Sequence, residues 1–386
     1  MTRLLDGNPQ RVLYLSHTAR LSGAEIGLLR FVRATRGRVE ATVALAEDGD
    51  LVAPLREAGA RVEVLPLDES ARGLKRGEVA LGARQLRAAA SVSRYALTLR
   101  GLIRAVAPDL VHTNSLKAGP YGTAAARSAR IPVVWHLHDH LTPEYLPRRA
   151  VTPMRLLAGW TPSGLVTPSQ SVLRLVMPRR PGMPAEAIPF PIPVPDAPVA
   201  LRDEARVVGM VGRLAPWKGQ HVFLEAFARA FPRGPVRARL IGSAVFGEAD
   251  YEASLRAQAA RLQIADRVEF AGFRADIDRA LPELDVLVHA SVLPDPLPTT
   301  VLEGMGAGLP VVAADAGGNH EHVVDGVNGL LHAPGDADDL ARALRRAIGD
   351  RASREALGTA ARRSARAFTE DVVVDRMLDF YRRVHR

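Results

Sequence analysis

Two carboxylates, Asp295 and Glu303, lie eight residues apart in the segment Leu-Pro-Asp-Pro-Leu-Pro-Thr-Thr-Val-Leu-Glu-Gly. Prolines brace the loop around Asp295, and Glu303 falls one turn inside a short helix that begins near Thr299 and Thr300. The first N–H groups of a helix are unpaired and attract anions. Carboxylates repel a bare phosphate, but they accept hydrogen bonds from sugar hydroxyls. The segment therefore predicts a ligand with both hydroxyls and phosphate, such as a sugar nucleotide.

The pair Thr300 and Glu303 has a second interpretation. A Thr followed three residues later by Glu is also the pattern of a capping box, in which each side chain bonds the other residue's backbone N–H. The spacing alone favours the cap and the ligand site about equally. The choice between them depends on the rest of the chain.

Two basic residues form a second candidate, after the expected strand Val207–Val211. Arg213 and Lys218 lie between this strand and the next helix, in Gly-Arg-Leu-Ala-Pro-Trp-Lys-Gly-Gln. Cations placed there can clamp a diphosphate and stabilise a nucleoside-diphosphate leaving group. A solvated lysine is the ordinary alternative. However, a helix N-terminus disfavours cations, and Lys218 is one of only three lysines, which favours the clamp.

Three glycines follow other expected strands. Ser22-Gly23-Ala24 forms a small turn through which a ligand can approach a helix N-terminus, although the Gly-x-Gly-x-x-Gly spacing of a dinucleotide site is missing. An ordinary turn capped by Ser22 fits this segment equally well. Gly317 and Gly318 follow the strand Val311–Ala314 and offer backbone N–H groups.

Histidines and acidic pairs raise the question of a metal. His136 and His138 share one side at the end of the strand Val133–Leu137, but no carboxylate stands at metal-ligand spacing, so zinc is not expected. Asp139 is instead expected to orient a neighbouring imidazole. The motif Asp276-Ile-Asp278 resembles a metal-binding pair, but it begins a helix, where acidic residues simply favour the dipole. No metal site is expected.

The composition indicates a globular protein of two domains. The 386 residues suit two units of roughly 150–200 residues each. Cysteine is absent, which excludes disulfides, zinc–thiolate sites and thiol nucleophiles. No apolar run is long enough to cross a bilayer, and the N-terminus is unlike a signal peptide, so a cytoplasmic location is expected. The net charge of +9 raises nucleic-acid binding, but the 5% aromatic content and the absence of its motifs argue against it.

Short β-rich runs alternate with helical stretches in both halves, which is typical of parallel α/β sheets. The proline-rich segment from Met177 to Pro198 is expected to be an extended connector without sheet or helix. We therefore expect two Rossmann-like doubly wound domains that face each other across a cleft. The predicted bounds are 1–195 for an N-terminal acceptor-side domain, 196–368 for a nucleotide-sugar-binding domain and 369–386 for a helix that packs back on the first domain.

Taken in this order, the motifs resemble those of retaining glycosyltransferases of the GT-B fold, family 4. Gly212-Arg213-Leu214 with Lys218-Gly219 is similar to the family's phosphate clamp, and Asp295 through Glu303 is similar to its pair of acids. Three further segments match the family's motifs: Ser22-Gly-Ala-Glu25 near the N-terminus, and Gly317-Gly318 and Asp325-Gly-Val-Asn-Gly329 after the pair of acids.

The resemblance implies a role for each of the matching residues. Glu303 would bind the nucleotide ribose, Arg213 and Lys218 the diphosphate, and Asp295 the donor sugar, with His138 near the reacting centre. It also implies that no metal or other cofactor is required. Two departures stand out: the first acid is usually Glu, and an interdomain Asn-Gly turn is replaced here by Pro-Phe-Pro-Ile-Pro.

The expected function is transfer of a sugar from a UDP- or GDP-type donor to an acceptor hydroxyl with retained configuration. The acceptor would be a small molecule such as an aminocyclitol, a glycan or a lipid-linked precursor. A sugar-nucleotide epimerase of the same fold and a catalytically silent partner subunit are the alternatives. Residues 70–104 carry eight basic residues and one acidic residue. This stretch either contacts an anionic membrane peripherally or forms a core helix with a solvated arginine face.

Overall fold

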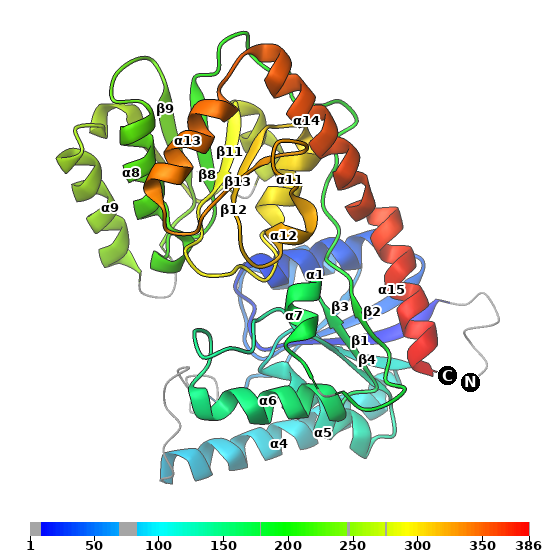
Figure 1. Ribbon diagram of the computed structural model, residues 1–386. Coiled ribbons are helices and arrows are strands. Elements are labelled where there is room, and N and C mark those ends of the chain that lie inside the picture. The colour runs from blue at the N-terminus through cyan, green and yellow to red at the C-terminus, as the bar shows by residue number, and fades with distance from the viewer. Residues whose placement is uncertain (1–8, 69–82, 178, 245–247, 275, 386) are drawn as a thin grey trace. The chain divides into compact units, whose positions relative to one another are not determined.

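The computed structural model describes residues 9–68, 83–177, 179–244, 248–274 and 276–385, with the backbone alone for residues 83–90. The chain forms two compact units, Met1–Pro191 with Glu370–Arg386, and Ile192–Thr369. Each unit is a parallel sheet with helices on both faces (Figure 1). The first unit ends at Pro191, a few residues before the boundary predicted near residue 195.

The first unit is built on a seven-stranded sheet in the order β3-β2-β1-β4-β5-β6-β7. Most of its strands are runs of Val, Leu and Ala that are buried on both faces, as parallel sheets require. The order 3-2-1-4-5 is that of a doubly wound sheet. The strands are β1 Gln10–Ser16, β2 Val39–Leu45, β3 Arg61–Val64, β4 Leu110–Thr113, β5 Val133–His136, β6 Gly164–Thr167 and β7 Ala185–Ala187.

Helices cover both faces of this sheet and bury two separate apolar clusters. One face packs against α1 Gly23–Ala34, α2 Val52–Glu57 and α15 Glu370–His385. The other packs against α4 Ala83–Val106, α5 Ala118–Ser128, α6 Arg148–Trp160 and α7 Gln170–Arg174. In α4, Tyr95, Leu99 and Ile103 are buried at helical spacing, so this predicted helix does contribute to the core.

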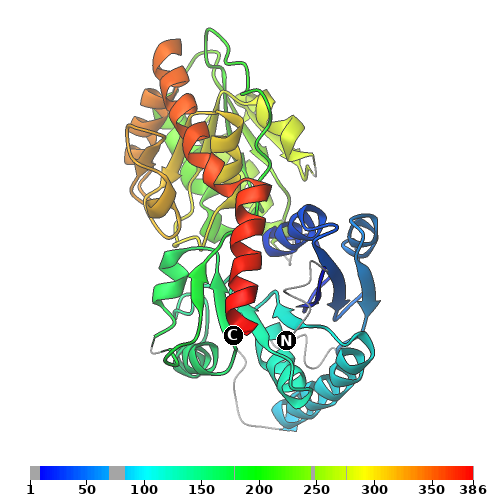
Figure 2. The same ribbon diagram turned by 90° about the vertical axis from the view of Figure 1, so that its right-hand side faces the viewer.

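The C-terminal helix α15 belongs to the first unit and lies along it (Figure 2). Its side chain Tyr381 is fully buried, with the hydroxyl 2.7 Å from His112 Nδ1. The predicted apolar stripe is largely present, but Val372 is 37% exposed and Val374 is 1% exposed. The buried face is therefore rotated slightly from the face that the sequence indicated.

The second unit has a six-stranded parallel sheet in the order β10-β9-β8-β11-β12-β13. Its strands are β8 Val207–Val211, β9 Arg237–Ile241, β10 Val268–Gly272, β11 Val286–His289, β12 Val311–Ala314 and β13 Leu330–His332. One face packs against α8 Gln220–Ala230, α9 Ala249–Arg261 and α13 Ala337–Ala347, and the other against α11 Thr299–Ala307 and α14 Arg351–Ala365. The short elements are α10 Ile277–Ala280, α12 Asn319–His322, η2 Pro216–Lys218, η3 Ala265–Arg267, η4 Leu281–Glu283 and η5 Arg366–Phe368.

The connector prediction is wrong at one point. Strand β7 lies inside the proline-rich segment and pairs in parallel with β6. Proline removes a donor but leaves its carbonyl, and Pro184 O accepts a hydrogen bond from the Leu165 N–H. An edge strand needs partners on one side only, so three residues between prolines suffice. Among the described helices, none is both long and apolar enough to span a bilayer.

Candidate functional site

Three loops at one edge of the second sheet carry most of the predicted site residues. The turn after β8 holds Arg213 and Lys218, the loop after β11 holds Asp295, and the loop after β12 holds Gly317. Strands β8, β11 and β12 are consecutive neighbours in the sheet. Because parallel strands end at the same edge, their loops meet there, which is where ligands bind in such sheets.

Backbone contacts join these three loops directly. The Val292 N–H donates to Trp217 O at 2.9 Å, and the Gly318 N–H donates to Asp295 O at 2.9 Å. Gly219 has φ +77°, and a Cβ there would stand 1.9 Å from Ala290 O. Gly317 has φ +62°, and its Cβ would stand 2.1 Å from Asp295 O. Any other residue at these two positions would force the loops apart.

The partly exposed Lys218 and the buried Asp295 form an ion pair in this assembly. Lys218 Nζ lies 2.5 Å from Asp295 Oδ2 and 4.3 Å from the centroid of the Trp217 ring, within cation–π range. Burial opposes ionisation of Asp295, but the Lys218 charge and a hydrogen bond with His289 outweigh it, so the pKa of Asp295 is well below its usual value. Asp295 is therefore ionised at neutral pH.

His289, the last residue of β11, makes the second contact with this carboxylate. Its Nε2 lies 3.4 Å from Asp295 Oδ2 and 2.9 Å from Ser291 Oγ, and its Nδ1 lies 3.0 Å from Asn319 Nδ2. Burial lowers the pKa of His289, although Asp295 acts in the opposite direction. The imidazole is therefore neutral at neutral pH.

Arg213 is held separately from Lys218. Its Nε lies 3.6 Å from Glu248 Oε2, and its carbonyl accepts from Gln220 Nε2 at 2.9 Å. The guanidinium carbon lies 6.0 Å from the centroid of the Trp217 ring, which Lys218 also contacts. The two predicted phosphate ligands therefore both lie near the Trp217 ring, and each is close to a carboxylate.

Helix α11 begins differently from the capping-box prediction. Its N-cap is Pro298, and no side chain makes a cap hydrogen bond. Thr299 and Thr300 are the first two helical residues, so Thr300 cannot cap the helix as the box requires. Glu303 lies on the second turn and is only 4% exposed. The capping-box interpretation is wrong because the helix starts two residues earlier than that motif needs.

This result predicts the effect of Thr300→Val. A true Thr cap contributes about 1 kcal/mol to the free energy of unfolding. Since Thr300 caps nothing, Thr300→Val is expected to change that free energy by less than about 0.5 kcal/mol, the usual range for a surface substitution. Urea unfolding followed by circular dichroism measures it, with Asp350→Ala as the comparison. Asp350 caps α14 by accepting from the Ser353 N–H, so its loss should cost about 1 kcal/mol. Equal losses of unfolding free energy in the two variants would support the capping-box interpretation of Thr300 after all.

The first unit places His138 in a hydrogen-bonded setting. Its Nε2 lies 3.2 Å from Asn114 Oδ1, while Asn114 Nδ2 donates to Ala24 O at 3.2 Å. The carbonyl fixes the orientation of the amide, so Oδ1 accepts and His138 carries its proton on Nε2. Burial lowers the pKa of His138 to about 3. The sequence indicated Asp139 as the residue that orients an imidazole, and the structure shows Asn114 in contact with His138.

His136 lies beside His138, as the sequence predicted, although β5 ends at His136. The two ring centroids are 4.0 Å apart, and His136 Nδ1 lies 3.2 Å from His112 Nε2. Burial also lowers the pKa values of His112 and His136. The group therefore consists of neutral rings in contact, with His136 tilted against His138 and edge-on to His112.

The turn after β1 has a buried carboxyl and an open glycine. Glu25 is 2% exposed and accepts from the Ser16 hydroxyl at 3.1 Å and from the Ser22 hydroxyl. Burial raises the pKa of Glu25, and these hydroxyls moderate the rise. Ser22 is the N-cap of α1, but its hydroxyl bonds Glu25 and makes no cap hydrogen bond to the backbone. A Cβ on Gly23 would meet nothing within 4 Å, so open space adjoins this helix start.

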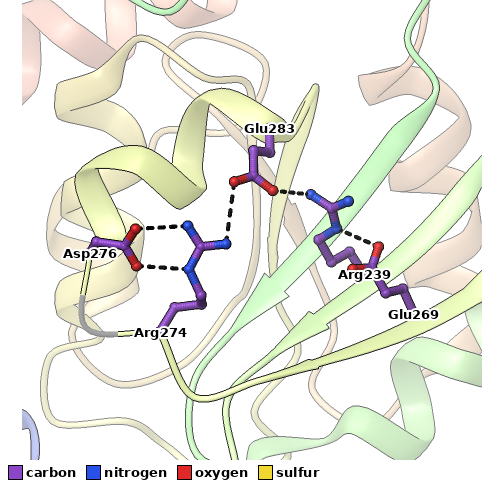
Figure 3. A network of polar contacts seen from close by, with 5 residues as sticks. All are labelled: Arg239, Glu269, Arg274, Asp276 and Glu283. Carbon is purple, nitrogen blue, oxygen red and sulfur yellow. Dashed lines mark hydrogen bonds and ion pairs between the residues drawn. The ribbon is translucent and has the colours of Figure 1, made fainter.

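The acidic motif that the sequence rejected as a metal site contributes to a salt-bridge network. Asp276 receives two hydrogen bonds from Arg274, at 2.7 Å and 2.8 Å (Figure 3). Glu283 links Arg274 to Arg239, which also pairs with Glu269. The Arg274 guanidinium lowers the pKa of Asp276 to about 2.

The sequence did not single out four residues that the structure adds. His289 contacts Asp295, Trp217 contacts Lys218, Ser291 contacts His289, and Asn319 follows the Gly317-Gly318 pair. His289 and Ser291 had a recognisable signal, because both stand at the C-terminal end of an expected strand, where ligands bind. Asn319 had none, since its contact joins residues thirty positions apart.

Comparisons with known proteins agree with this architecture. Residues 196–364 match the family described as "Glycosyl transferases group 1", and residues 22–191 match "Glycosyl transferase 4-like domain". The chain is similar to the crystal structure of Anabaena Alr3699/HepE in complex with UDP and glucose. The TM-score is 0.80 at 30% identity, and the match covers 96% of this chain and 98% of that chain.

Curated relatives match over shorter stretches. A lipopolysaccharide core biosynthesis glycosyltransferase, LpsE of Rhizobium meliloti, is 33% identical over 40% of this chain and 43% of its own length. The 2-deoxystreptamine glucosyltransferase of Streptomyces kanamyceticus is 34% identical over 37% of this chain and 36% of its own length. The match thus spans less than half the length of each of these curated relatives. Together with the two family matches and the full-length structural likeness, they show that the chain belongs to the group 1 glycosyltransferases of the GT-B fold.

Proposed function

We propose that this protein is a retaining hexosyltransferase of family 4 that uses a UDP-sugar as donor. The observation that carries the proposal is the assembly of Lys218, Asp295 and the Gly317-Gly318 loop at one edge of the second sheet. A cation and backbone N–H groups at that edge are suited to the charge that develops on a departing diphosphate. The similar structure that contains UDP and glucose supports a UDP donor over a GDP donor.

Each residue has a defined part in the proposed reaction. Arg213 and Lys218 bind the diphosphate, Glu303 binds the ribose, and Thr299 and Thr300 present the N-terminus of α11 to the phosphate. Asp295 faces the donor sugar, and in the first unit Gly23 leaves open space at the start of α1. The neutral His138 accepts a hydrogen bond from a substrate hydroxyl. The bond from the anomeric carbon to the phosphate oxygen breaks, and the acceptor oxygen bonds the same face while its proton passes to that phosphate oxygen.

The acceptor belongs to one of two chemical classes. LpsE and the 2-deoxystreptamine glucosyltransferase represent them: envelope glycans or lipid-linked precursors, and small aminocyclitols. We keep both classes as proposed acceptors, and the assays below include a member of each.

Two assays test the transferase assignment. UDP-glucose incubated with the protein and 2-deoxystreptamine should give a new α-glycoside, identified by the anomeric coupling constant in proton NMR. A second sugar nucleotide formed from donor alone would identify an epimerase. Protein that binds UDP in calorimetry but transfers nothing to any acceptor of either class would identify a silent partner subunit.

Metal independence is part of the proposal. Because Lys218 and Arg213 supply the positive charge, removal of divalent cations with excess EDTA should leave the transfer rate within about twofold of the untreated enzyme. A metal-dependent transferase binds its donor phosphates through the cation and loses activity on chelation. Initial rates with and without EDTA, and after adding back Mg²⁺ or Mn²⁺, decide between the two.

Peripheral membrane contact through residues 70–104 is a further part of the proposal. Residues 70–82 lie outside the described residues, but Arg94 and Arg104 are exposed on α4, opposite its buried face. Anionic lipid would attract such side chains by about 1 kcal/mol each. Sedimentation with phosphatidylglycerol vesicles at low and high salt tests this contact, and binding that is absent at both salt concentrations removes it.

A further inference from the structure

We propose that His289 is a positioning residue of the nucleotide site. Neutral and protonated on Nε2, it holds Asp295 and thereby fixes the direction of Lys218. The inference rests on the proposed function, because it assigns Lys218 to a donor diphosphate. It adds a residue that neither the sequence motifs nor the family match assigns.

The contacts of Asn319 determine which nitrogen of His289 is protonated. Asn319 Nδ2 lies 2.8 Å from Ala314 O and 3.0 Å from His289 Nδ1. A carbonyl only accepts, so the amide group must direct its NH₂ at Ala314, and its second N–H points at the imidazole. The Nδ1 atom is therefore the acceptor. The opposite amide orientation would place Oδ1 against the carbonyl of Ala314.

The proton on Nε2 then points toward Ser291 and the Asp295 carboxylate. Nε2 lies 2.9 Å from Ser291 Oγ and 3.4 Å from Asp295 Oδ2. Both the His289 imidazole and the Asn319 amide are buried, with these residues 4% and 1% exposed. A second proton on Nδ1 would oppose the Asn319 N–H, so the imidazolium form is excluded by the geometry as well as by burial.

One carboxylate oxygen thus accepts from Lys218 and faces the His289 Nε2–H, whose single proton is shared between Asp295 and Ser291 Oγ. Asp295 Oδ2 accepts from Lys218 Nζ at 2.5 Å on one side and faces His289 on the other. A lysine side chain has four rotatable carbon–carbon bonds, and fixing it in the free protein lowers the entropy lost on ligand binding. His289 therefore acts on the donor through Asp295 and Lys218, without touching it.

Two substitutions separate positioning from simple packing. His289→Leu fills the space but removes both polar atoms, whereas His289→Gln keeps one acceptor for Asn319 and one N–H for Asp295. We expect His289→Leu to weaken UDP binding about tenfold and to lower kcat/KM for UDP-glucose about 10²-fold, the scale of a small misplacement of a catalytic group. His289→Gln should recover most of both losses. Calorimetry with UDP and initial rates measure the two quantities.

Nuclear magnetic resonance gives a readout that a packing role would not change. The nitrogen-15 shifts of the His289 ring should show the neutral Nε2–H tautomer from pH 6 to pH 8. The chain has only three lysines, so the Lys218 ammonium signal can be assigned with Lys75→Arg and Lys117→Arg. This signal should be protected from exchange in the wild type and in His289→Gln, and lost in His289→Leu.

The possible failures are distinguishable. A wild-type protein that does not bind UDP contradicts the proposed donor, while the tautomer and the lysine signal still test the inference. An imidazolium or an Nδ1–H tautomer overturns the inference whatever the activity, as does an unchanged Lys218 signal in folded His289→Leu. If His289→Leu does not fold, the wild-type tautomer and the recovery by His289→Gln decide.

Discussion

Lys218→Ala is expected to lower kcat for sugar transfer by about 10²- to 10³-fold, the loss that follows removal of one preorganised charge contact to a transition state. Lys218 is suited to this role because it is only partly exposed and already held by Asp295. As the bond to the sugar breaks, negative charge grows on the diphosphate, and a fixed ammonium stabilises it without reorganising. The loss should appear in kcat and kcat/KM alike.

The same substitution also leaves a buried carboxylate without its cation, which must be separated from catalysis. The folded-state pKa of Asp295 lies below its unfolded value, so the pair stabilises the fold above the unfolded pKa and loses that contribution as the pH falls through the folded pKa. Lys218→Ala should therefore have a smaller free energy of unfolding at pH 7. Rates are to be measured on protein shown to be folded by circular dichroism.

A matched control exists in the salt-bridge network of Figure 3. Arg239→Ala also removes one partly buried cation; Arg239 pairs with two carboxylates, Glu269 and Glu283, away from the three loops of the site. Its turnover should stay within about twofold of the wild type. Transfer by folded Lys218→Ala at a similar rate would contradict the assignment of Lys218 to the diphosphate.

The alternation of strands and helices was predictable because it depends on local patterns. Runs such as Val286–His289 and Val311–Ala314 are apolar on both faces, which is typical of strands in a parallel sheet that helices cover on both sides. Strand β7 escaped prediction because the prolines around it break the pattern, while an edge strand tolerates them. An edge strand such as β7 forms hydrogen bonds with a neighbour on one side only, and the amino-acid composition of a segment does not show whether it lies at an edge.

The site was predictable to the level of its loops, but its contacts were not. The sequence placed Lys218 and Asp295 in one domain as separate ligands, one for phosphate and one for sugar. The structure pairs them, although they are 77 positions apart in the sequence, because β8 and β11 are neighbours in the sheet. Likewise, α11 starts at Thr299 with Pro298 as its N-cap, whereas the spacing of Thr300 and Glu303 alone was compatible with a cap at Thr300.

Glu303→Ala is expected to lower kcat/KM for a UDP-sugar by about 10²-fold. Glu303 is 4% exposed on the second turn of α11, so a hydrogen bond from a ligand hydroxyl to its carboxylate forms in surroundings largely removed from water. Hydrogen bonds from ribose hydroxyls to a charged acceptor are worth about 1.5–3 kcal/mol, and a carboxylate in a confined site rejects a ligand that lacks them. Glu303→Gln, which keeps an acceptor oxygen but loses the charge, should fall between the wild type and Glu303→Ala.

Donors without ribose hydroxyls test this contact more sharply than the rate alone. For the wild type, 2′-deoxy- or 3′-deoxy-UDP-glucose should lose about as much in kcat/KM as Glu303→Ala loses with the natural donor. If Glu303 binds the ribose, the deoxy donor should cause little further loss in Glu303→Ala. The variant has already lost the carboxylate that accepts a hydrogen bond from the missing hydroxyl. A double-mutant cycle between enzyme and substrate measures this coupling. Losses that simply multiply would show that Glu303 acts elsewhere, since independent contacts are additive in free energy.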